Sequence, residues 1–114
     1  MLKLKEEVEP ILKQIGLTKI KFRYDYSPRY SKVIASVNYD RHLLEITGVR
    51  LVIGDKFLEC NENIRHRILQ HEVAHVYDAY YNKRNSKHDK IFKDLCEGLY
   101  GDRTIGQATI KGWK

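Results

Sequence analysis

Two histidines and a glutamate stand in a pattern that can hold a metal ion and activate water. They are His71, Glu72 and His75, within the sequence His-Glu-Val-Ala-His. Residues four apart lie one above the other on an α-helix, so His71 and His75 can present two imidazole nitrogens to one ion. This spacing is typical of zinc proteases, in which the glutamate takes a proton from water. The motif predicts a Zn²⁺ site that supports hydrolysis.

A simpler interpretation is an amphipathic helix that carries two histidines by accident. The neighbouring positions argue against it, because they are apolar and predict a largely buried helix: Ile68, Leu69, Val73, Ala74 and Val76. Two buried histidines beside a buried carboxylate are costly unless another group pairs with them. A metal ion would be such a partner.

A catalytic zinc ion needs a third protein ligand and one open position. The candidates after the motif are His88, Asp89, Asp94 and Glu97. His88 opens the next predicted helix, after a loop long enough to fold back, whereas Glu97 lies deeper in that helix. Both spacings are feasible, and the residue chemistry alone prefers His88 only slightly.

The stretch HEVAHVYDAYYNKRNSKHDKIFKDLC resembles the SprT-like metalloprotease family, to which the Spartan proteases belong. That family follows the first motif with a polar loop, a third histidine with Gly or Asp after it, and then an aromatic residue. Here His88-Asp89 and Phe92 fill those places. The resemblance extends from about Ser31 to Leu99, with a short loop before His88 and without the accessory zinc ribbon of many relatives.

The resemblance implies a small zincin-like domain in which three histidines bind one Zn²⁺, with Glu72 as the catalytic base. The zinc ligands it implies are His71, His75 and His88. It also implies a metalloendopeptidase, and Spartan-type relatives digest proteins crosslinked to DNA. Two alternatives stay open: a small gluzincin-type cytosolic peptidase with Glu97 as third ligand, and a zinc-stabilised DNA-binding or inert structural module without turnover.

Several elements must position these residues. A helix is expected over residues 3–15, despite Pro10, with Gly16 as its stop. Alternating or apolar runs predict strands over 18–26, 32–39, 42–47 and 50–54, with Gly48 ending the third. Short links favour a mostly antiparallel sheet of three or four strands. Residues 50–53 are expected at an edge that pairs with a substrate strand.

The helix of the motif is expected to begin after Asn61, a plausible N-cap, and to end near Tyr81. A last helix follows over 89–99, ended by Gly98 or Gly101. The fold class is therefore α+β, as a single domain over residues 1–114, with a core over 1–101 and a tail over 102–114. If residues 104–114 cover the cleft, their removal raises activity.

Composition sets the wider limits. The 114 residues carry a net charge of +6 with a pI near 9.3, which favours acidic partners such as DNA. In the loop after the motif, Lys83, Arg84 and Lys87 form a basic group that could contact DNA. The sequence has no apolar run of membrane-spanning length and no signal-peptide core, so we expect a cytoplasmic protein. In that compartment its two cysteines, Cys60 and Cys96, are expected to be free thiols. Peptide or protein substrates and no membrane are expected, and the oligomeric state is not predicted.

Three further side chains near the motif allow two roles each. Tyr77 and Tyr100 could stabilise an oxyanion, although tyrosines more often serve packing. Asp78 could orient a histidine or could be an exposed helix carboxylate.

Overall fold

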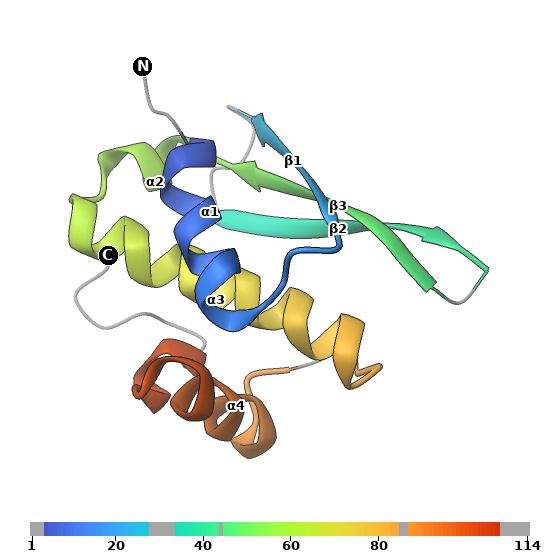
Figure 1. Cartoon of the computed structure of the whole chain (residues 1–114). Helices are drawn as coiled ribbons and strands as arrows, with labels where there is room; N and C mark the ends of the chain where they lie inside the picture. Colours follow the sequence, from blue (N-terminus) through green and yellow to red (C-terminus); the bar gives the residue numbers. More distant parts are fainter. Residues whose placement is uncertain (1–3, 28–33, 44, 85–86, 108–114) are drawn as a thin grey trace. The chain divides into compact units, whose positions relative to one another are not determined.

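The computed structural model describes residues 4–27, 34–43, 45–84 and 87–107, and its architecture is α+β, as expected (Figure 1). The elements in chain order are α1 (Leu4–Ile15), β1 (Lys21–Tyr26), β2 (Ala35–His42), β3 (Glu45–Ile53), α2 (Asp55–Glu59), α3 (Glu62–Tyr81), α4 (Lys90–Tyr100) and the 3-10 helix η1 (Arg103–Gly106). They form two compact units, residues 1–61 and residues 62–114. The single domain expected over the whole chain stays a prediction.

The sheet of the first unit has the strand order β1-β3-β2. β2 and β3 form an antiparallel hairpin, whereas β1 runs parallel to β3, so the sheet is mixed and not mostly antiparallel. The apolar run of β3 explains this order, because Leu51, Val52 and Ile53 are all buried, as is typical of a central strand. The edge position predicted for residues 50–53 is therefore wrong.

β3 is one strand where two were expected. Gly48 does not break it but pairs with Lys21 of β1 and Asp40 of β2. A glycine is useful there because a Cβ would lie 3.0 Å from the Asp40 carboxylate, which lies over this position. The predicted strand over 32–39 is observed from Ala35 onward, since residues 32 and 33 lie outside the described ranges.

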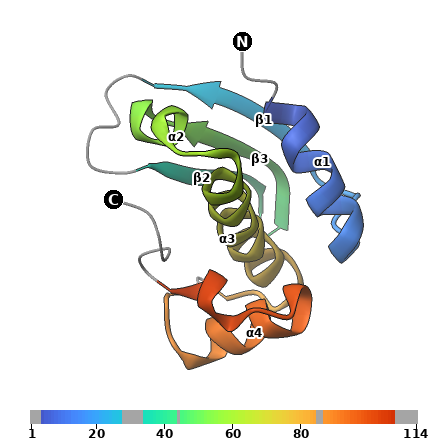
Figure 2. The ribbon, with the colours of Figure 1, turned by 90° about the vertical axis from the view of Figure 1, so that its left-hand side faces the viewer.

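The first helix has the predicted apolar stripe, and its buried residues are Leu4, Val8, Ile11 and Leu12. Pro10 lies inside a continuous helix, and Gly16, with a φ of 77°, follows its end. α1 lies beside β1 (Figure 2), and the two elements line a common pocket that includes Phe22 and Tyr24. The short helix α2 was not predicted, because its five residues are too few for a helical repeat.

The second unit contains the helices that carry the motif. α3 begins directly after Asn61 and ends at Tyr81, as predicted. Asp89 caps α4 by accepting a hydrogen bond from the backbone N–H of Phe92 at 3.0 Å, and Gly101, with a φ of 75°, ends it. Ile91, in the first turn of α4, is 60% exposed. The buried core between these elements consists of Ala74, Phe92, Cys96 and Ile105.

Part of the tail predicted over residues 102–114 is structured. Residues 103–106 form η1, and Ile105 is buried in the core. Residues 108–114, with Trp113, lie outside the described ranges. Cys60 and Cys96 are both free thiols, as predicted. Among the described residues, no helix combines the length and the apolar character needed to cross a bilayer.

Candidate metal centre

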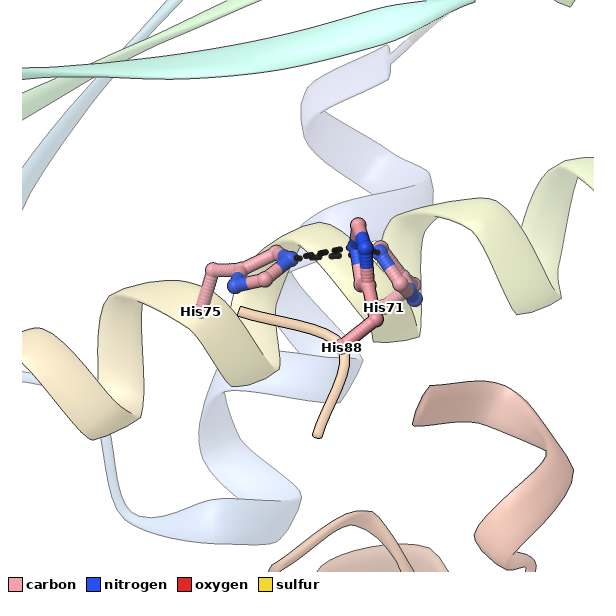
Figure 3. A group of neighbouring side chains, drawn as sticks. All are labelled: His71, His75 and His88. Atoms are coloured by element: carbon pink, nitrogen blue, oxygen red, sulfur yellow. Dashed lines mark hydrogen bonds between the residues drawn. The ribbon is translucent and has the colours of Figure 1, made fainter. Parts of the chain in front are cut away.

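Three histidine side chains meet in the second unit (Figure 3). His71 and His75 come from successive turns of α3, and His88 comes from the segment just before α4. Their Nε2 atoms lie 3.0 Å apart for His71 and His88, 3.2 Å for His71 and His75, and 3.3 Å for His75 and His88. The structure therefore brings together the three residues that the sequence suggested as metal ligands.

The spacing of these nitrogens fits a zinc ion. Zn–N bonds of about 2.0–2.1 Å in a tetrahedral arrangement place two nitrogens about 3.3 Å apart. All three observed separations are close to that value. The three Nε2 atoms cannot all hydrogen-bond to one another at these distances. In a neutral imidazole each nitrogen carries either a proton or a lone pair, so at least one of the three contacts joins two donors or two acceptors. A cation at the centre of the three nitrogens would satisfy all of them.

Burial keeps the two helix histidines in the form that can bind a metal. Desolvation lowers the pKa of His71 to about 4 and that of His75 to about 3, and His88 adds to both effects. Both rings are therefore neutral at pH 7, as metal ligation requires. These pKa values suit a metal site, although desolvation of a packed histidine lowers the pKa in the same way.

Glu72 follows His71 on α3 and is partly buried. Desolvation raises the pKa of its carboxyl to about 8. A cation held by the neighbouring histidines would stabilise the carboxylate and lower that pKa again. The side chain could then exchange a proton with water near neutral pH, which is what a general base must do.

The rings are held by packing as well as by hydrogen bonds. Phe92, which is fully buried, stacks on His75 with 4.2 Å between ring centroids and meets the edge of His71 at 5.4 Å. The Nδ1 of His71 lies 2.5 Å from the backbone carbonyl oxygen of Ile105. A carbonyl oxygen only accepts, so Nδ1 carries the proton and Nε2 presents its lone pair to the other histidines.

The segment that carries His88 is tied to the end of α3. Arg84 donates to the carboxylate of Asp89 at 2.9 Å and pairs with the fully buried carboxylate of Asp78 at 3.4 Å. Asn82 donates to the same Asp78 at 2.8 Å. Asp78 is thus neither an exposed carboxylate nor a direct partner of a histidine in these contacts. It anchors the arginine that holds the N-terminus of α4.

The three basic residues after α3 have different surroundings. Arg84 is largely occupied by its two carboxylate partners, so it is a structural residue more than a DNA contact. Lys83 and Lys87 are exposed, and the ammonium of Lys83 lies over the ring of Tyr80 at 5.6 Å. Of the three basic residues, these two keep an accessible charge.

Glu97 and the two candidate tyrosines lie in other surroundings. Glu97 is exposed and forms an ion pair with Arg103 at 3.8 Å, and the three-histidine cluster does not include it. Tyr100 donates a hydrogen bond to the carbonyl of Gln70 at 2.9 Å, and burial raises the pKa of its hydroxyl. Tyr77 packs against Tyr81. The geometry favours His88 over Glu97 as third ligand and gives both tyrosines packing contacts.

Sequence reasoning missed the contribution of residues 102–106. The segment is too short to show a periodic pattern of apolar residues, so its contacts could not be predicted from the sequence. One signal was present: Asp102 two residues before Thr104 is typical of a capped turn. Ile105, within the tail that could cover the cleft, lies in the core and contacts His71.

Comparison with known proteins agrees with this geometry. A model of the SprT-like family matches residues 6–111, a span that includes the three histidines and Glu72. No curated protein and no solved structure matches the chain. Because the family match covers nearly the whole chain, the protein belongs to the SprT-like family.

Proposed function

We propose that the protein is a zinc-dependent metalloendopeptidase that hydrolyses peptide bonds. The observation that carries this proposal is the convergence of three Nε2 atoms at 3.0–3.3 Å, next to a glutamate that follows the first ligand on the same helix. Membership of the SprT-like family supports the same reaction class. The three histidine ligands found among the described residues leave one position for substrate or water.

His71, His75 and His88 would hold the ion in this proposal. When bound, Zn²⁺ supplies Lewis-acid chemistry, which polarises the scissile carbonyl and acidifies water. Phe92 keeps bulk water from one face of the His75 ring, because it stacks on that ring inside the core. The donor set is therefore rigid before substrate binds, which lowers the cost of assembling the site.

Glu72 acts as the general base in this proposal. Its carboxylate takes a proton from the water that attacks the peptide carbonyl, and it then passes that proton to the leaving nitrogen. Burial makes the Glu72 carboxylate more basic than one in water, and a cation on the neighbouring histidines would keep it ionised and ready to take up a proton. A carboxylate fully in water would be a weaker base.

The test compares Glu72→Gln with Glu97→Gln, a matched change at an exposed carboxylate outside the cluster. Zinc content and cleavage of an unfolded protein such as casein are measured for both. Glu72→Gln should keep its zinc and lose turnover by at least about 100-fold, whereas Glu97→Gln should match the parent protein. Full activity of Glu72→Gln would contradict the proposed base. Zinc binding by the parent protein without any turnover would favour the non-catalytic module.

The substrates proposed here are proteins bound or crosslinked to DNA. The net charge of +6 supports an acidic partner. So do two exposed lysines in the segment before His88, Lys83 and Lys87. Replacing both lysines by alanine should weaken DNA binding and reduce its salt dependence, because each phosphate contact releases counterions. The matched control is Lys5→Ala with Lys13→Ala on α1, which removes the same charge elsewhere. If both double variants weaken DNA binding equally, the lysines before His88 make no specific contribution and the attraction depends only on net charge.

A further inference from the structure

Residues 102–106, which directly follow α4, end beside the first metal ligand. We propose that this segment is a positioning device for the metal centre: the Ile105 carbonyl selects the tautomer of His71, and Arg67 holds the segment in place. This inference rests on the proposed function, because a positioned His71 matters only if the centre binds Zn²⁺. The contacts that carry it involve only atoms of the protein.

The contact between Ile105 and His71 decides which ring nitrogen is free. Nδ1 donates to the Ile105 carbonyl oxygen at 2.5 Å, so the proton of the neutral ring sits on Nδ1. The Nε2 lone pair then faces the corresponding nitrogens of His75 and His88. In the other tautomer, Nε2 would present a proton where a ligand lone pair is needed. A partner on the far nitrogen of a ligating histidine commonly fixes its orientation and basicity.

Arg67 ties this segment to the helix that carries His71. One guanidinium nitrogen donates to the Asp102 carboxylate at 2.9 Å, and another donates to the Thr104 hydroxyl at 2.6 Å. The backbone N–H of Thr104 also donates to Asp102 at 2.9 Å, which closes the turn. Arg67 precedes His71 by four residues, so the anchor and the ligand lie on the same face of α3.

Two apolar contacts hold the segment from the other side. The Ile105 side chain is 3% exposed and belongs to the cluster with Phe92, the residue that also packs on His71. Gly106 lies so close to α4 that a Cβ there would be 2.9 Å from the Cα of Lys93. A carbonyl fixed between the two hydrogen bonds of Arg67 and a packed helix cannot move without disturbing one of them.

The first experiment measures the tautomer of His71 in the parent protein and uses a variant only to assign its signal. Long-range proton–nitrogen NMR on the metal-free, full-length protein reports the tautomer of each of the five histidines. His71 is assigned by the signal lost in His71→Asn. The expected result is an Nδ1–H tautomer for His71 at pH 7.5. An Nε2–H tautomer, or an equal mixture of both, overturns the proposal.

The second experiment measures the Zn²⁺ dissociation constant by competition with a chelator. Arg67→Ala and Gly106→Ala should each weaken Zn²⁺ binding by about 10- to 100-fold, the usual range for loss of a partner behind a ligating histidine. Arg67→Lys, which keeps the charge but not both contacts, should fall between Arg67→Ala and the parent protein. The matched control is Arg23→Ala in β1, since Arg23 lies outside this segment and pairs with Asp40 at an exposed position.

A merely structural role for Arg67 is separated by the tautomer spectrum. Folded Arg67→Ala protein should show His71 as a mixture of tautomers, whereas Arg23→Ala should keep the parent spectrum. Zn²⁺ binding by folded Arg67→Ala within threefold of the parent value overturns the proposal. Both readouts are independent of peptide cleavage. An inactive protein that shows the expected tautomer and affinities would refute the peptidase and leave this inference standing.

Discussion

Phe92 lies flat on the imidazole ring of His75, with 4.2 Å between ring centroids and 9° between ring planes. The same phenylalanine touches His71 edge-on and is fully buried. It also meets His88 edge-on at 6.0 Å between ring centroids, so one core side chain contacts all three metal-ligand candidates. The aromatic position that follows the third histidine in the sequence is thus part of the support of the site.

Shortening this aromatic ring should affect the metal centre beyond its effect on stability. Phe92→Leu is expected to destabilise the fold by roughly 1–2 kcal/mol and to weaken Zn²⁺ binding, because the His75 ring loses its stacking surface. Phe57→Leu is the control, since Phe57 is equally buried but lies in the first unit. Urea unfolding and Zn²⁺ titration are compared for both. Equal Zn²⁺ affinities in the two variants would show that Phe92 only fills the core.

Arg84 should behave as a structural residue. Arg84→Ala leaves the buried Asp78 carboxylate without its positive partner, so a loss of about 3–5 kcal/mol in unfolding free energy is expected. The control is Arg23→Ala, which removes an exposed pair with Asp40 and should cost about 0–1 kcal/mol. Denaturant unfolding measures both values.

A double variant tests the cause of that loss. Arg84→Ala combined with Asp78→Asn removes the buried charge together with its partner, so it should be clearly more stable than Arg84→Ala alone. If the double variant is less stable than both single variants, the buried carboxylate is not the reason that Arg84 matters.

The first unit carries its own pH dependence through Tyr24. Burial and, next, the charge of Glu9 raise the pKa of the Tyr24 hydroxyl from 10.0 to about 12. A raised pKa means that the folded state resists loss of the proton, so stability is fully present below pH 10 and is lost as the pH rises through 12. Because the Tyr24 side chain is only partly buried, solvent screening reduces the full linkage value of roughly 1.4 kcal/mol at pH 11 to about 1 kcal/mol or less.

Tyr24→Phe should remove that part of the alkaline transition. The variant and the parent protein are unfolded in urea at pH 8 and at pH 11, and the difference between their free energies of unfolding is compared. The difference should move by about 1 kcal/mol in favour of Tyr24→Phe at the higher pH. An unchanged difference would contradict the burial of an ionisable hydroxyl at this position.

The main helix and the meeting of three histidines could be predicted because their signals are local. A helix places His71 above His75 by its own geometry, and the following polar loop has room to return His88. The resemblance to the family added His88 where residue chemistry hardly distinguished it from Glu97. The structure then separates the two, since Glu97 pairs with Arg103 at the surface.

The sheet and the segment after α4 could not be predicted in the same way. Strand order depends on contacts between distant residues, and the apolar run of β3 was taken for an edge although burial on both faces is typical of a central strand. The role of the Ile105 carbonyl is a backbone contact, which leaves almost no trace in residue types. Arg84 was assigned to DNA from its charge, whereas its buried partner Asp78 is visible only in three dimensions.

The most direct test of the three-histidine centre is the zinc content of purified protein after dialysis, for the parent chain, His88→Ala and Glu97→Ala. The parent protein and Glu97→Ala should retain one Zn²⁺ per chain, and His88→Ala should lose its tightly bound metal. Circular dichroism confirms that each variant is folded. Retention of zinc by His88→Ala with loss in Glu97→Ala would contradict the centre described here, as would a parent protein that binds no zinc.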